Sequence, residues 1–246
     1  MNRLVRAEWY RFLHAGHFVE WLIIVCAVII SLMWAVEPDI LSLNIEQMLP
    51  ACVEGSMSIQ LFVPVLVAVI VGFGYMRKTA YYEVMAGNKI SQIILSKVVV
   101  DAIVVAVCAF AAFCVIPAMA YIRNGLGDVN HVGERVALFF VILLHICIAG
   151  ALMATALRHI IASVAIYLRF AALEGILSMI LLLIASEETP KWLEIVQEWL
   201  VVNQITQVFL GEVTARFTVA VLGSLLLEAA FLYVISYICM KKKLYR

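Results

Sequence analysis

The chain has little charge, and its charges cancel. Only 14% of the 246 residues are Asp, Glu, Lys or Arg, against about 25% in ordinary soluble domains, while 65% are apolar. Seventeen basic residues balance seventeen acidic ones. A water-soluble chain of this size cannot bury so much apolar surface. The composition therefore excludes a soluble enzyme, a disordered segment and a nucleic-acid-binding module, and it predicts a membrane protein.

Motifs for catalysis, metal binding and nucleotide binding are also missing from the sequence. There is no G-x-S-x-G or H-E-x-x-H motif, and no Cys or His cluster has metal-ligand spacing. None of the twelve glycines belongs to a G-x-x-x-x-G-K-[ST] phosphate loop. Five of the six cysteines lie inside apolar runs, which argues against a disulfide framework. We expect no catalytic residue, metal site or cofactor on this chain, and no ATP hydrolysis by the chain alone.

Six long apolar runs dominate the sequence instead. They cover residues 18–36, 56–76, 98–121, 136–157, 160–185 and 217–240. A helix that crosses a bilayer takes about 20 residues, so each run is long enough to be a span. The first run has bulky Trp34 near its end and no small-residue cleavage site, so we expect it to be retained. The sequence predicts an all-α polytopic membrane protein in which residues 1–246 form a single transmembrane domain with six transmembrane helices.

Lys and Arg are distributed unequally between the two sides that six alternating spans define. Twelve belong to the side of the termini: Arg3, Arg6, Arg11, Arg77, Lys78, Lys89, Lys97, Arg158, Lys241, Lys242, Lys243 and Arg246. Four belong to the opposite side: Arg123, Arg135, Lys191 and Arg216. Because basic residues concentrate in cytoplasmic loops, we expect both termini in the cytoplasm.

Two further segments are amphipathic without spanning. Residues 1–17 carry basic side chains largely away from an apolar face formed by Val5, Trp9, Phe12 and Leu13. This pattern predicts an interfacial helix on the inner leaflet, with a flexible basic N-terminus as the alternative. Residues 191–210, within an outer segment at 186–215, alternate apolar and polar faces at helical spacing. They predict an outer helix, or a broken re-entrant helix pair, before the last span.

The connection after the second span, residues 77–97, holds a short predicted helix at 79–86 that ends at Gly87. A short helix between two spans on the cytoplasmic side can dock into a groove of a partner protein. Aromatic residues and Met are favoured at the centres of such interfaces. The candidate partner-binding residues are Thr79, Tyr81, Tyr82, Glu83, Met85 and Gly87. A plain interfacial loop buried against the inner leaflet is the alternative.

The order of these features resembles the membrane permease subunits of type-2 ABC exporters. In that family a basic interfacial helix, here MNRLVRAEWYRF, precedes six spans. An acidic residue, a glycine and a lysine that begins the third span match Glu83, Gly87 and Lys97 here. An outer helical hairpin, matching 191–210, precedes the last span, and a basic tail follows it. The resemblance covers the layout of the whole chain and is strongest to short bacterial permeases of antimicrobial-peptide, lantibiotic-immunity and drug or sodium efflux systems.

The resemblance implies a membrane transport function. Residues 79–86 would be the coupling helix, which contacts a separate ABC ATPase subunit that binds ATP and Mg²⁺. A second permease, either a copy of this chain or a related one, would complete the exporter in the bacterial cytoplasmic membrane. The substrate would be amphipathic: a peptide, a drug or a lipid-like molecule. The identity of the substrate, homodimer against heterodimer, and export against an immunity or sensing role all stay open.

Glu174 and Glu228 lie near the centres of the fifth and last predicted spans, and Arg169 lies five residues before Glu174. A charge at mid-bilayer costs about 2.5–3.5 kcal/mol on insertion scales, which favours pairing. Arg169 and Glu174 are five residues apart, about 140° around an α-helix, so we expect no direct pair on one face. We expect Arg169 to pair with Glu228, or with Glu174 of another protomer.

These buried charges also leave other functions open. An ion- or proton-coupled secondary transporter that uses Glu174 and Glu228 as carriers is the main alternative. The sequence halves show no convincing internal repeat, which such a transporter often has. A polytopic membrane enzyme and a non-transporting anchor for a sensor complex are further alternatives.

Overall fold

The computed structural model describes residues 2–14, 17–36, 42–76, 79–158, 165–166, 168–184 and 191–244. All regular structure in these ranges is helical, which confirms the predicted all-α fold. The α-helices are α1 (Asn2–His14), α2 (His17–Val36), α3 (Ile45–Met76), α4 (Thr79–Met85), α5 (Ile90–Lys97), α6 (Ile103–Asn124), α7 (Val132–Leu157), α9 (Glu174–Ile184), α10 (Lys191–Trp199), α11 (Val201–Leu210) and α12 (Ala215–Leu244). The π-helices are η2 (Val98–Ala102) and η3 (Leu168–Leu173).

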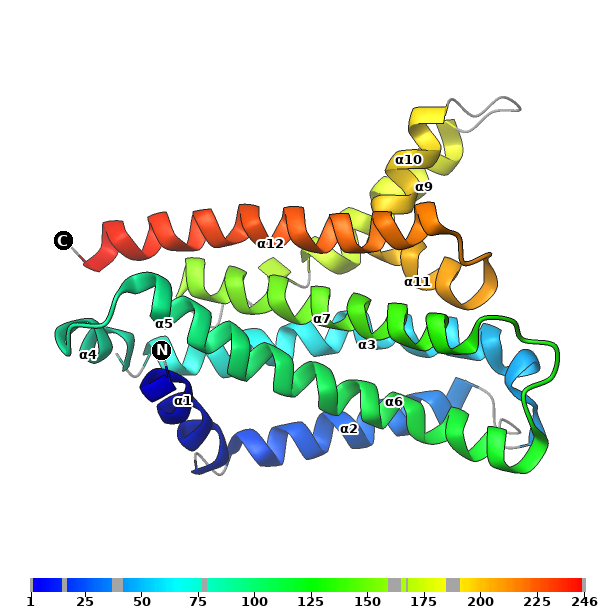
Figure 1. Ribbon diagram of the computed structural model, residues 1–246, viewed down its shortest axis with the longest axis horizontal. Helices are drawn as coiled ribbons and strands as arrows, with labels where there is room; N and C mark the ends of the chain where they lie inside the picture. Colours follow the sequence, from blue (N-terminus) through cyan, green and yellow to red (C-terminus); the bar gives the residue numbers. More distant parts are fainter. Residues whose placement is uncertain are drawn as a thin grey trace.

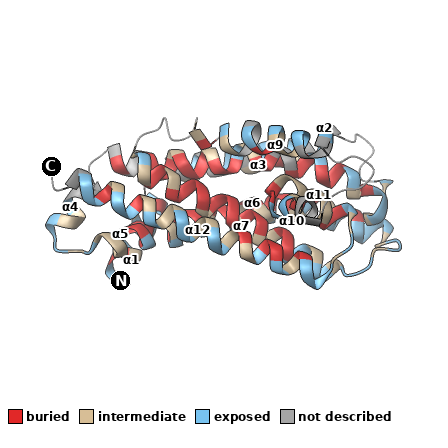
Figure 2. Cartoon of the chain, turned by 90° about the horizontal axis from the view of Figure 1, so that it is seen from above, coloured by how far each residue is buried: buried red, intermediate tan, exposed pale blue. Residues whose placement is uncertain are grey.

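The long helices run along one axis and form a bundle (Figure 1). Helix α7 is central: it packs against α3, α6 and α12, and most of its side chains between Leu138 and Thr155 are buried. Figure 2 shows buried residues running along α3, α6 and α7. Gly150 allows α7 to approach α3 closely, because a Cβ there would lie 3.0 Å from the carbonyl oxygen of Pro64.

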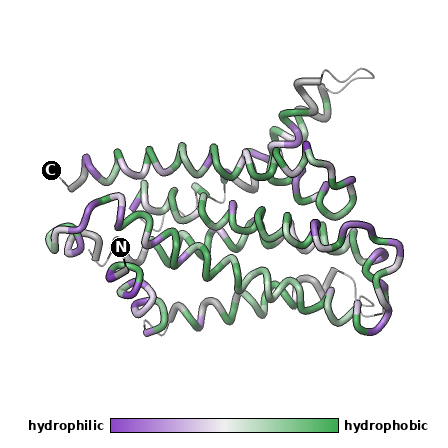
Figure 3. Tube along the Cα trace, in the orientation of Figure 1, coloured by the Kyte–Doolittle hydropathy of each residue, from purple (hydrophilic) through white to green (hydrophobic). Residues whose placement is uncertain are grey.

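Three helical segments in the described residues are long and apolar enough to cross a membrane: Ile90–Asn124, Val132–Leu157 and Ala215–Lys242. A fourth is counted if Ile45–Ser56 and Ile59–Gly72, which bend by 41°, form one span. Apolar residues fill the middle of the bundle, and hydrophilic ones gather at both ends (Figure 3). This is the structure expected of a membrane protein. The first predicted span corresponds to the 20-residue α2, and 160–185 lies partly outside the described residues.

Two helices extend beyond the predicted apolar runs. Helix α3 begins at Ile45, eleven residues before the predicted start, and the helix that continues through η2 into α6 begins at Ile90. The extension of α3 is amphipathic: Glu46 and Glu54 are exposed, whereas Met48 and Cys52 are buried. The helix therefore begins before the apolar run does. One face of the extension packs against neighbouring helices, while the other face is polar.

The two ends of the bundle differ in content. Helices α1, α4 and α5 lie at the end that holds both termini, while the α6–α7 connection lies at the other end (Figure 1). Residues 2–14 form the predicted amphipathic helix. Of its predicted apolar face, Phe12 is buried, whereas Trp9 and Leu13 are nearly half exposed. Helix α1 thus packs against the bundle along one side and leaves apolar side chains on another.

The segment 191–210 is the broken helix pair that the sequence offered as one alternative. Helix α10 ends at Trp199, and α11 begins at Val201 after a break at Leu200. Helix α11 packs against α3 and α7. Helices α9 and α10 extend beyond the long helices (Figure 1), although α10 still contacts α12.

Candidate functional site

A buried cluster of four charged residues joins α1 to the helix that begins at α5. Arg11 Nε lies 2.5 Å from Glu8 Oε2, and Arg11 Nη2 donates to Asp101 Oδ2 at 3.0 Å. Lys97 donates from Nζ to Glu8. Glu8, Lys97 and Asp101 are 98% or more buried. Two cations and two anions balance, as buried charges must when they leave water.

The cluster forms where the buried face of α1 packs against one face of the junction between α5 and η2. Leu4, Glu8 and Phe12 recur every four residues and form the buried face of α1. Lys97 and Asp101 are likewise one turn apart, at the junction of α5 and η2. Sequence reasoning named Lys97 but missed the partners of this lysine. An acidic residue inside a predicted span, Asp101, was the available signal.

Helix α4 is the predicted short helix after the second span. It ends in a Schellman motif: Gly87 N donates to Val84 O at 2.9 Å, and Asn88 N donates to Glu83 O at 3.2 Å. Gly87 adopts φ +85°, a left-handed conformation that glycine accepts without strain. The prediction that the helix breaks at Gly87 is confirmed.

The surface of α4 presents the predicted anchors. Tyr82 is 67% exposed and Met85 is 70% exposed. Glu83 is half-buried, and its Oε2 atom is covered and has no hydrogen-bond partner among the described residues. Burial raises the pKa of the Glu83 carboxyl, although the nearby charges of Lys97 and Arg11 oppose the rise. The side chains of Thr79 and Tyr81 lie outside the described residues.

A second charged network joins four helices inside the bundle. Arg169 Nη1 donates to Glu174 Oε1 at 2.5 Å, and Nη2 donates to the two carboxylate oxygens of Glu228 at 3.2 and 3.3 Å. His145 Nε2 lies 2.9 Å from Glu228 Oε2. Glu174 Oε2 accepts from the backbone N–H of Val202 at 3.2 Å, at the start of α11. The network links α7, α9, α11 and α12 through η3.

The expectation that Arg169 and Glu174 do not pair directly is wrong. It assumed α-helical geometry, but residues 168–173 form a π-helix. The i→i+5 hydrogen bonding of a π-helix widens the turn and brings residues five apart together. The predicted pair between Arg169 and Glu228 across helices is confirmed. Sequence reasoning missed His145, whose signal was an ionisable side chain inside the fourth apolar run.

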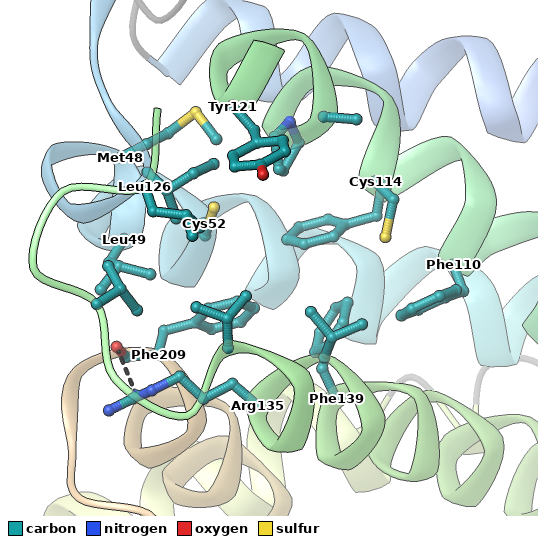
Figure 4. A pocket seen from close by; sticks show the side chains of 17 residues that line it. Met48, Leu49, Cys52, Phe110, Cys114, Tyr121, Leu126, Arg135, Phe139 and Phe209 are labelled. Atoms are coloured by element: carbon teal, nitrogen blue, oxygen red, sulfur yellow. Dashed lines mark hydrogen bonds between the residues drawn. The ribbon is translucent and has the colours of Figure 1, made fainter. Parts of the chain in front are cut away.

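An apolar cavity of about 390 Å³ lies between α3, α6, α7 and α11 (Figure 4). Rings of Phe113, Phe139 and Phe209 form one wall, with centroids 4.5 Å apart for Phe113 and Phe139 and 5.1 Å apart for Phe139 and Phe209. Arg135 lies at one side and donates to the carbonyl oxygens of Val208, Phe209 and Gly211 at 2.6–3.0 Å. These bonds cap the end of α11, whose last carbonyls have no partner within the helix.

Among the residues that the structure describes, no group of three His, Cys, Asp or Glu side chains is arranged to hold a metal ion. No protein-family model matches the chain, and comparisons with curated proteins and with solved structures find no significant match.

Proposed function

We propose that this chain is the permease subunit of an ATP-driven type-2 ABC exporter in a bacterial cytoplasmic membrane. A separate ATPase subunit would bind ATP and Mg²⁺ and would contact α4. The observation that supports this proposal is the position of α4: a short helix at the end of the bundle, with Tyr82 and Met85 on its surface. Exposed aromatic and Met side chains are typical of interface centres.

Helix α4 is well placed to transmit force. It follows α3 after two residues and is joined to α5 by the turn at Gly87. The helix that begins at α5 continues through η2 into α6 and is fixed to α1 by the Glu8–Lys97 and Arg11–Asp101 pairs. Movement of α4 would therefore be passed through the Gly87 turn to the helix that begins at α5, and through the ion pairs to α1.

The proposal also covers the number of spans, the side of the membrane on which the termini lie and the pairing of two permeases. Six spans would place both termini and α4 in the cytoplasm, where an ATPase can bind, because twelve of the seventeen Lys and Arg residues fall on that side. Two permeases would assemble around the path, with α10 and α11 at its outer end. The substrate would be an amphipathic peptide, drug or lipid-like molecule.

The experiment is purification of the tagged chain from its native host, followed by identification of partners that contain a phosphate-binding loop. The proposal predicts an ATPase that co-purifies. Tyr82→Ala combined with Met85→Ala should reduce its recovery at least fivefold, because both side chains leave the α4 surface. Tyr10→Ala is the matched control, since Tyr10 is a 63% exposed tyrosine on α1 at the same end of the bundle. Absence of an ATPase, or equal recovery with all variants, would refute the exporter.

The Arg169 network supports a second candidate, a proton- or ion-coupled secondary transporter. Among the described residues, the network brings the carboxylates of Glu174 and Glu228 to the guanidinium of Arg169, and an intramembrane carboxylate can carry a proton. Such a transporter moves substrate in proteoliposomes when a proton gradient is imposed without ATP. Glu228→Gln should abolish that transport. An ATP-dependent exporter would show no transport driven by the proton gradient in the first place.

A further inference from the structure

The cavity between α3, α6, α7 and α11 is unexplained by a coupling role for α4. We propose that it binds one acyl chain of an amphiphile that enters from the bilayer. The proposal requires only that the chain crosses a membrane, and it holds whether or not an ATPase binds α4.

The walls of the cavity favour an apolar ligand over water. The cavity is open on one side, and its volume of about 390 Å³ lies within the roughly 300–1,000 Å³ typical of pockets that hold small ligands. A buried water needs two to four polar partners. The guanidinium of Arg135, the charged group among the described lining residues, donates to the backbone carbonyl oxygens of Val208 and Gly211 at the end of α11. The remaining walls are mainly Phe, Leu, Met and Val side chains.

The mouth of the cavity opens on an apolar surface. Ala118 and Tyr121 of α6 and Val136 of α7 line the cavity, and all three are exposed. Next to them on α6, Met119 is 41% exposed and Ile122 is 80% exposed. In a membrane-embedded chain, side chains of this kind face lipid. The most concentrated apolar molecules at the mouth are therefore acyl chains.

The length of the cavity also fits one acyl chain. Lining residues on α6 extend from Phe110 to Tyr121, about 16 Å at 1.5 Å per residue. One leaflet contributes about 15 Å of the roughly 30 Å hydrocarbon core. The cavity ends beside the polar connection at 125–131, where a headgroup would meet the bilayer surface. A single chain can thus lie along the cavity with its polar end at the interface.

The test is photocrosslinking of the full chain in lipid nanodiscs. One arm uses phosphatidylcholine with a diazirine in one acyl chain, and the other uses a diazirine derivative of palmitate. Crosslinked residues are mapped by mass spectrometry. Cavity binding predicts labels on Phe110, Cys114 and Phe139. Labels from the first arm identify a bilayer lipid as the occupant, and labels from the second identify a single-chain amphiphile.

Variants at the mouth test the assignment. Ala118→Trp and Val136→Trp place a bulky ring at the mouth from two different helices, and each should lower cavity labelling at least fivefold. Ala111→Trp is the matched control, because Ala111 is exposed on the same face of α6, two turns away, and does not line the cavity. Labels confined to lipid-facing residues such as Val107 and Val115, or cavity labelling equal in all variants, would overturn the proposal.

Discussion

Lys97→Met tests whether the buried charge cluster holds α1 to the bundle. Methionine keeps a flexible apolar stem of similar length but removes the ammonium that donates to Glu8. Among the described residues, Arg11 is then the one cation left beside Glu8 and Asp101, so the cluster loses one of its two balancing positive charges. Removal of one partner from a buried ion pair costs about 3–5 kcal/mol. For a chain of this size, that loss lowers the melting temperature by about 6–20 °C.

The assay is thermal unfolding in detergent. A thiol-reactive fluorophore monitors the unfolding, because it reacts with the buried Cys52 and Cys147 as they become exposed. Glu8→Gln together with Lys97→Met restores charge balance, so the double variant should melt above the Lys97→Met variant. Lys89→Met is the matched control, because Lys89 is exposed one residue before α5, and it should change stability by less than about 0.5 kcal/mol. Losses in the double variant that equal the sum of the single losses would refute the pairing.

Three further variants test local features. Glu83→Gln should stabilise the chain at pH 7 but not below about pH 4, because burial raises the pKa of the folded carboxyl and ionisation above the ordinary value of about 4.3 then opposes folding; unfolding measured at both pH values checks this. Gly87→Ala should cost about 1 kcal/mol because φ is +85°, while Gly133→Ala, in ordinary helical backbone with open space, should not destabilise the chain in the same melting assay. Arg135→Met should leave the end of α11 uncapped, and hydrogen exchange of the α11 amides should accelerate while the amides of α7 keep their protection.

The helical class and several local features follow from the sequence because they depend on neighbouring residues. Apolar runs longer than 20 residues require helices, since backbone groups in lipid must be bonded within the segment. The helix at 79–86 and its end at Gly87 follow from local turn chemistry. The broken pair at 191–210 follows from apolar spacing and was one of two alternatives. The six-span topology and the side of each terminus stay predictions.

Sequence spacing by itself was misleading where the helix type changed. The 140° separation of Arg169 and Glu174 holds only for an α-helix, and the π-helical turn removed it. No residue pattern in that segment predicted the π-turn. Contacts with Glu228 on α12 and with the N–H of Val202 on α11 accompany it, and such contacts depend on the packing of distant segments.

The sequence by itself determined that this is an apolar, helical protein of the membrane class and that a short helix lies between two long ones. Composition and local spacing are enough to settle those properties. Only the tertiary structure decided which charges meet. Glu8 and Lys97 are 89 residues apart, and His145 and Glu228 are 83 apart. The same packing formed the apolar cavity, whose walls come from four helices. Contacts between distant segments depend on how helices pack, and local patterns do not encode that packing.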